Sequence, residues 1–141
     1  MRKVCGIEIK GSEAILAVAE KNGEEIRHVN VGTKKLPLID DENSEHIKSF
    51  IALVSGFVRD NDINEIKIKK RSKKGEYAGG PITFKIEALI QSINECSVEL
   101  IPAQSIGAAN RKHAFNLPLT LNKYQHEAFL AACASLVRDL K

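Results

Sequence analysis

The fold of this chain is decided by one stretch near its start, Val4-Cys5-Gly6-Ile7-Glu8-Ile9-Lys10-Gly11. The stretch is an apolar, strand-like run that ends in a turn, and it carries one acid, Glu8. A charged group in a central hydrophobic strand is costly unless it is paired, hydrated or bound to a metal. Two further strand-like runs, residues 14–20 and 25–31, follow before any helix. The pattern predicts an antiparallel meander of three strands with an acid in the first.

The rest of the chain alternates between helical and strand patterns. Apolar residues at helical spacing predict an amphipathic helix over 44–59, with Asn43 or Ser44 as its N-cap. A strand is predicted over 63–69, and after a loop Gly80-Pro81 opens a second helix. The remaining predicted elements are a fifth strand at 98–101, a short helical turn at 105–111, and a last helix that begins near Asn122, where Gln125 completes a capping box.

The predicted order is strand, strand, strand, helix, strand, helix, strand, helix. This order, in one α/β domain with a five-stranded mixed sheet, resembles the ribonuclease H-like superfamily and especially its RuvC resolvase-like branch. The segment Gly6-Ile7-Glu8 before a glycine-containing turn resembles the Gly-Ile-Asp of that branch, and His126-Glu127-Ala128 resembles the start of its last helix. The whole sequence is also similar to a small bacterial domain-of-unknown-function family. The resemblance implies a single ribonuclease H-like domain over residues 1–141.

Resemblance to RuvC-like nucleases implies a site for Mg²⁺ or Mn²⁺ that is built from acids. Two such ions roughly 3.5–4 Å apart can hold the attacking and leaving oxygens of a phosphodiester displacement, and both take carboxylate ligands. Glu8 and Glu127 are the expected metal ligands and catalytic acids. The branch has another acid at the end of its fourth strand, whereas residues 65–71 here read Glu-Ile-Lys-Ile-Lys-Lys-Arg. Glu76, in the following loop, is the nearest candidate for the missing catalytic acid.

Both acids also have a purely structural interpretation. Glu8 could be a strand-end acid that pairs with Lys10 or Lys69, because structural ion pairs also occupy such positions. Glu127 could be a helix N-terminal acid that the helix dipole favours. The two motifs leave these alternatives open.

A basic, glycine-rich loop follows the fourth strand. Six of the eight residues over 67–74 are Lys or Arg. A lysine run by itself is usually a solvated loop, but in a ribonuclease H-like sheet the fourth strand ends beside the first, so these cations would surround Glu8. We expect phosphates to bind the cations and a base to stack on Tyr77. The expected nucleic-acid-binding residues are Lys69, Lys70, Arg71, Lys73, Lys74, Tyr77, Arg111 and Lys112.

Composition sets broad limits on the class of protein. A length of 141 residues indicates one domain, and 43% hydrophobic with 28% charged residues is typical of globular proteins. The net charge of +3 is too small to prove a polyanionic partner. No membrane-length apolar run or signal-peptide core is visible, so a cytoplasmic location without a membrane partner is expected. Cys5, Cys96 and Cys133 form no Cys-x-x-Cys pair and are expected to be reduced and mostly buried.

Three classes of function remain open. The preferred hypothesis is a non-catalytic module that binds DNA or RNA, in which Lys69, Lys70 and Arg71 neutralise phosphates where a nuclease would bind metal. The alternative is a Mg- or Mn-dependent nuclease that acts on structured or branched nucleic acid. A sugar-kinase or actin-like nucleotide binder shares the glycine-flanked opening acid, but such proteins close two lobes over ATP, and 141 residues hold one.

Overall fold

The chain folds around one mixed sheet whose strands run in the order β3-β2-β1-β5-β6. The computed structural model describes residues 2–71 and 80–138. The central strand β1 pairs antiparallel with β2, which pairs antiparallel with β3, whereas β5 and β6 run parallel to β1. The bounds are Arg2–Lys10 for β1, Glu13–Asn22 for β2, Glu25–Val29 for β3, Glu65–Lys69 for β5 and Ser97–Ile101 for β6. The five strands and their mixed pairing confirm the predicted ribonuclease H-like architecture.

A sixth strand, β4, was not predicted. It comprises Lys35–Pro37 and pairs antiparallel with the first residues of β2, beyond the end of β3. Three residues are too few to show alternation, and Pro37 lacks the N–H that a longer ladder would need. Its register nevertheless matters, because it places Lys35 level with Glu8 across the sheet, with Ile15 of β2 between them.

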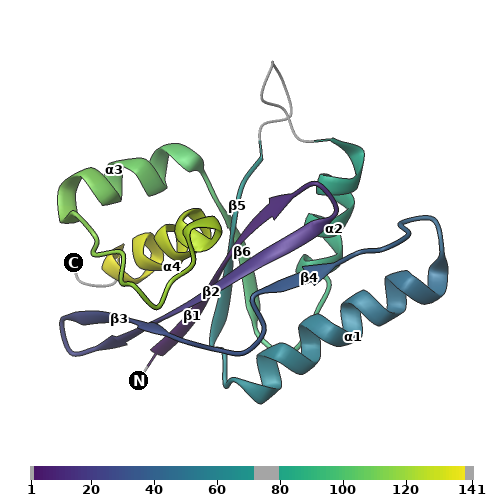
Figure 1. Ribbon diagram of the computed structural model, residues 1–141, viewed down its shortest axis with the longest axis horizontal. Helices are drawn as coiled ribbons and strands as arrows, with labels where there is room; N and C mark the ends of the chain where they lie inside the picture. The colour runs from purple at the N-terminus through teal and green to yellow at the C-terminus, as the bar shows by residue number, and fades with distance from the viewer. Residues whose placement is uncertain (1, 72–79, 139–141) are drawn as a thin grey trace.

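Helices cover both faces of the sheet (Figure 1). α1 (Ser44–Asp60) and α2 (Pro81–Gln91) pack on one face, where they share a core with Cys5, Ile7 and Ile9 of β1. α3 (Ala103–His113) and α4 (His126–Arg138) lie on the other face, and a short 3-10 turn, η1 (Lys123–Gln125), leads into α4. Asn43 is the N-cap of α1 and accepts hydrogen bonds from the N–H groups of Glu45 and His46.

Gly6 allows α4 to lie unusually close to the central strand. A Cβ atom at this position would lie 1.7 Å from the carbonyl oxygen of Ala128 and 2.9 Å from the backbone nitrogen of Ala132. Only glycine leaves room for that backbone. The alanines of α4 are buried, with Ala128 and Ala132 in the core that this helix shares with β1 and β2. The start of α4 is thereby held next to Glu8, two residues after Gly6.

The cysteines are free thiols, as predicted, with Cys5 and Cys133 buried and Cys96 half-buried. Burial raises the pKa of Cys133 to about 12 and also raises that of Cys5, so both thiols stay protonated at neutral pH. Among the described residues, no helix combines the length and apolarity needed to cross a membrane.

Candidate functional site

Strand register places Glu8 beside Lys69 at the carboxyl ends of β1 and β5. The parallel pairing runs from Val4 opposite Glu65 to Ile7 opposite Ile68, and one further step brings residue 8 level with residue 69. Val4 belongs to the core under α4, whereas Cys5 and Ile7 belong to the core under α1 and α2. Because side chains alternate along a strand, Glu8 faces α4.

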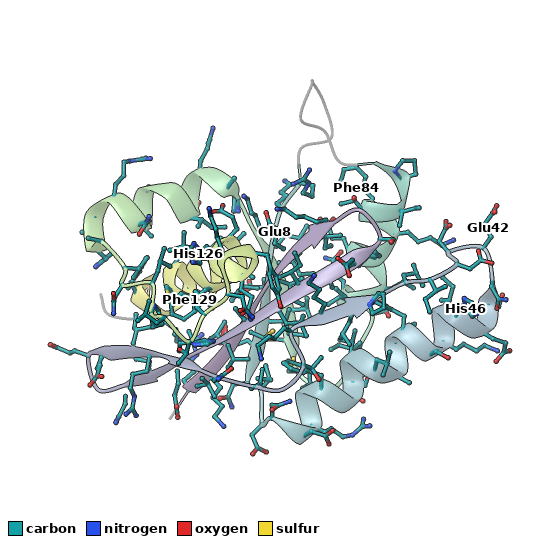
Figure 2. The ribbon with its side chains drawn as sticks, viewed as in Figure 1. Glu8, Glu42, His46, Phe84, His126 and Phe129 are labelled. Carbon is teal, nitrogen blue, oxygen red and sulfur yellow. The ribbon has the colours of Figure 1, made fainter. Side chains whose placement is uncertain are left out.

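Lys69 joins the two acids that the sequence singled out. Its Nζ lies 2.7 Å from Glu127 Oε1, to which it donates a hydrogen bond, and 3.8 Å from Glu8 Oε2. Glu8 is only 4% exposed, whereas the side chain of Glu127 is 45% exposed. Glu127 lies in the first turn of α4, and Figure 2 shows Glu8 on the face that this helix covers. The three residues form one cluster, which we call the acid-lysine cluster.

Burial dominates the electrostatics of Glu8. It raises the pKa of this carboxyl, and the negative charge of Glu127 acts in the same direction. Lys69, Lys10 and Arg71 oppose the increase, in that order of strength. Glu8 is therefore a buried acid whose charged form depends on the cations at the ends of β1 and β5.

The described residues do not fit a two-metal centre. Within residues 2–71 and 80–138, no group of three or more His, Cys, Asp or Glu side chains is placed to hold a metal ion. The ammonium of Lys69 instead contacts both predicted ligands, Glu8 and Glu127. Glu76, the third predicted acid, lies outside the described residues.

Part of the predicted basic surface lies at the acid-lysine cluster. Lys70 is exposed, and its backbone N–H bonds to the carbonyl oxygen of Ile101. The charges of Arg71 and Lys10 oppose the rise in the pKa of Glu8 that burial causes; Lys10 had been considered only as an ion-pair partner. Gly80 is the N-cap of α2 with Pro81 at its first position. Lys73, Lys74 and Tyr77 lie outside the described residues.

Arg111 and Lys112 lie at a different place from the rim expected around Glu8. They belong to the last turn of α3, which runs away from the end of β6 (Figure 1). Lys112 lines a cavity of about 610 Å³ beside Ala134 and Val137, two turns along α4 from Glu127. Lys67, the first residue of the basic run over 67–74, also lines this cavity. It forms ion pairs with Glu65 and Glu99.

The row of side chains through Glu8 extends across the sheet to β4. Glu8 is paired with Ile15 of β2, and Ile15 is paired with Lys35 of β4. Directly paired residues point to the same face, so Lys35, Ile15, Glu8 and Lys69 form one line on the face of the sheet where α4 packs, with Lys35 exposed at one end. We call this line the carboxyl-edge row. Sequence reasoning missed Lys35 because β4 itself carries almost no strand signal.

Comparison with other proteins agrees with the family resemblance and with the fold. Residues 1–135 match the model of a family described as protein of unknown function (DUF3010). No curated protein sequence matches the chain.

The structure is similar to solved junction resolvases. RuvC of Thermus thermophilus superposes with a TM-score of 0.73 at 10% identity, over 98% of this chain and 95% of that one. The same protein in complex with a Holliday junction substrate gives 0.68 at 11% identity, over 99% and 96%. The fowlpox virus resolvase in complex with Holliday junction DNA gives 0.59 at 14% identity, over 99% of both chains. The predicted RuvC-like fold is confirmed.

Proposed function

The chain belongs to the DUF3010 family, and we propose that it is a nucleic-acid-binding module of RuvC-like fold whose carboxylate site holds a lysine in place of a metal ion. The observation that supports this most is the position of Lys69, whose Nζ contacts both Glu8 and Glu127. An ammonium held there offsets part of the negative charge of the two acids, which would otherwise repel a phosphate. It adds no Lewis acid, so binding is favoured over cleavage.

Local charge supports a polyanionic ligand. The carboxyl ends of β1 and β5 carry four cations, Lys10, Lys69, Lys70 and Arg71. The acid-lysine cluster at the same place contains two acids, Glu8 and Glu127. Carboxyl ends of strands in α/β sheets are the edge where ligands usually bind. Two of the similar structures hold Holliday junction DNA. Branched DNA is therefore the first ligand to test.

A binding titration tests the proposal. Fluorescence anisotropy would compare a four-way junction, a duplex and a single strand, each at several salt concentrations. Replacing Lys69, Lys70, Arg71, Lys73 and Lys74 by Gln should weaken binding and reduce the slope of log affinity against log salt by about 1 for each lost phosphate contact. The control for loss of charge elsewhere replaces two lysines on helices of the opposite face, Lys48 and Lys85, by Gln. The proposal would be rejected if the variant with five substitutions bound each probe with the same affinity and salt dependence as the control variant.

One observation favours the alternative, a Mg- or Mn-dependent nuclease. Glu8 and Glu127 converge on a single point, as two metal ligands would. Cleavage would require Lys69 to leave that point and a further acid, for which Glu76 is the sequence candidate. We expect little cleavage of junction DNA by the purified protein with either ion. If cleavage occurs, and Glu8→Gln abolishes it while junction binding persists, the nuclease hypothesis replaces the binding module.

A further inference from the structure

Tyr124 lies at one end of the carboxyl-edge row. Its ring is 4.4 Å from Lys35 Nζ, measured to the ring centroid, in a cation-π contact. The residue belongs to η1, immediately before α4, and precedes Glu127 of the acid-lysine cluster by three positions. An aromatic ring, the two lysines of the carboxyl-edge row and the two acids thus lie at one end of the sheet.

The turn that carries Tyr124 is firmly held. Gln125 is 1% exposed, and its Nε2 donates to the carbonyl oxygen of Leu16 at 2.8 Å. Its Oε1 accepts from the backbone N–H of Asn122 at 2.9 Å, and Asn122 Nδ2 donates to the Tyr124 hydroxyl at 3.3 Å. Tyr124 itself remains 37% exposed. The ring is therefore preorganised and still open to a ligand, which reduces the entropy that binding must offset.

We infer that Tyr124, with the Lys35 ammonium over one face of its ring, forms a stacking platform on its other face for one unpaired base of a nucleic-acid strand that passes outside η1 and the first turn of α4. This inference rests on the proposed function and deepens it, because it names the substrate class. The platform takes single-stranded nucleic acid or the unpaired nucleotides beside a branch point.

The dimensions of the row suit such a strand. Lys35 and Lys69 are separated by three inter-strand steps, since β4, β2, β1 and β5 are neighbours. At about 4.8 Å for each step the two lysines are about 14 Å apart, or roughly four nucleotides of a stacked strand at about 3.4 Å each. Ile15 and Glu8, between the two lysines, are buried, so a strand that spans this distance would cross above η1, with its phosphates near the two lysines and a base within reach of Tyr124.

A stacking ring needs a base with an uncovered face, and this requirement favours an unpaired base. Inside a duplex the faces of each base are covered by its neighbours, so an added aromatic ring can stack only at an end, a gap or a branch. Every base has such a face, so the platform is expected to tolerate any sequence. Lys35 contributes its charge to the phosphate next to the stacked base.

The test measures the affinity for an oligo(dT) strand and for a blunt duplex in parallel. Tyr124→Ala should weaken oligo(dT) binding by roughly 5- to 150-fold and leave duplex binding nearly unchanged. Tyr124→Phe keeps the ring and should bind like the wild type, whereas Tyr124→Leu keeps apolar volume without the ring and should behave like Tyr124→Ala. Lys35→Gln should weaken binding to both probes, and Lys48→Gln, on α1, is its charge-matched control.

A second readout reports stacking directly. A strand with 2-aminopurine among its unpaired positions should lose fluorescence when it binds the wild type or Tyr124→Phe, and should lose little with Tyr124→Leu. If the wild type binds strands and duplex but Tyr124→Leu retains full affinity and quenching, the platform is refuted and the proposed function stands. If the wild type binds none of the nucleic acids, the proposed function fails, and the platform fails with it.

Discussion

Replacing Lys69 by Met should destabilise the protein in a way that depends on pH. Methionine keeps most of the length and apolar volume of lysine but removes the ammonium that contacts Glu8 and Glu127. Glu8, at 4% exposure, would then lose its strongest favourable charge. A buried acid in this situation takes up a proton rather than remain charged.

The size of the effect follows from the geometry and from proton linkage. Two unit charges 3.8 Å apart attract by about 4 kcal/mol at an effective dielectric constant of about 20, a gross value that the cost of burying Lys69 reduces. The loss of unfolding free energy cannot exceed the cost of protonating Glu8. Holding this carboxyl neutral at about pH 7, when its ordinary pKa is 4.5, costs at most about 3.4 kcal/mol. At about pH 5 the same ceiling is about 0.7 kcal/mol.

The sign of the pH dependence is fixed by the direction of the pKa shift. The pKa of Glu8 is already raised in the wild-type fold, so its contribution to stability is present at acidic pH and is lost as pH rises through the folded value. Removal of Lys69 raises that pKa further. We therefore expect Lys69→Met to lose less than about 0.7 kcal/mol of unfolding free energy at pH 5 and about 1–3 kcal/mol at pH 7.

Urea unfolding at the two pH values measures the loss. The control is Lys70→Met, which makes the same change at the neighbouring exposed lysine and should cost less than about 0.5 kcal/mol at either pH. A loss that is equal at both pH values, or is below the control at pH 7, would show that Lys69 does not sustain the charge of Glu8.

Three further substitutions test how the site is held. Gly6→Ala places a methyl group against the backbone of Ala128 and should cost about 3 kcal/mol or more in urea unfolding, or prevent folding. Gln125→Ala leaves the carbonyl oxygen of Leu16 without its buried donor and should cost about 1–3 kcal/mol, measured by thermal unfolding. Asn43→Ala removes the N-cap of α1 and should cost about 1 kcal/mol by the same measurement, whereas Asn43→Asp should be nearly neutral.

The order of strands and helices was predictable because each long element has a clear period. The apolar side chains of β1 and β2 and the helical spacing in α1 left little ambiguity. Two elements were harder to predict. β4 has only three residues, and α3, all of which the structure describes, buries just Ile106, so its helical stripe was too weak to indicate more than a turn.

The site was predictable as a pair of acids but not as a cluster. Glu8 stood out because it interrupts an apolar strand, and Glu127 because it begins a helix with many alanines. Whether Glu8 would pair with Lys10 or Lys69 depended on the register between β1 and β5. That register is set by tertiary packing, and it places Lys69 rather than Lys10 within 4 Å of Glu8 among the ion pairs of the described residues.

The lysines of the basic run differ in their surroundings, which their composition did not suggest. Lys67 and Lys69 both face α4, yet Lys67 is 6% exposed and is enclosed by Glu65 and Glu99, whereas Lys69 reaches the acids at the strand end. The sequence alone could not distinguish the two lysines, because they differ only in the acids that the neighbouring strands and α4 place beside them. Lys67 is therefore not part of the exposed positive surface that the basic run suggests.

The contact of one lysine with two acids has an evolutionary consequence. Lysine and glutamate codons differ by a single base, so one point mutation at position 69 would exchange the ammonium for a third carboxylate beside Glu8 and Glu127. The reverse mutation would turn a trio of acids into the ion-paired cluster seen here, beside the helix backbone for which Gly6 leaves room. A single base change therefore separates the ion-paired cluster of this chain from a set of three carboxylates, the ligand type that Mg²⁺ and Mn²⁺ prefer.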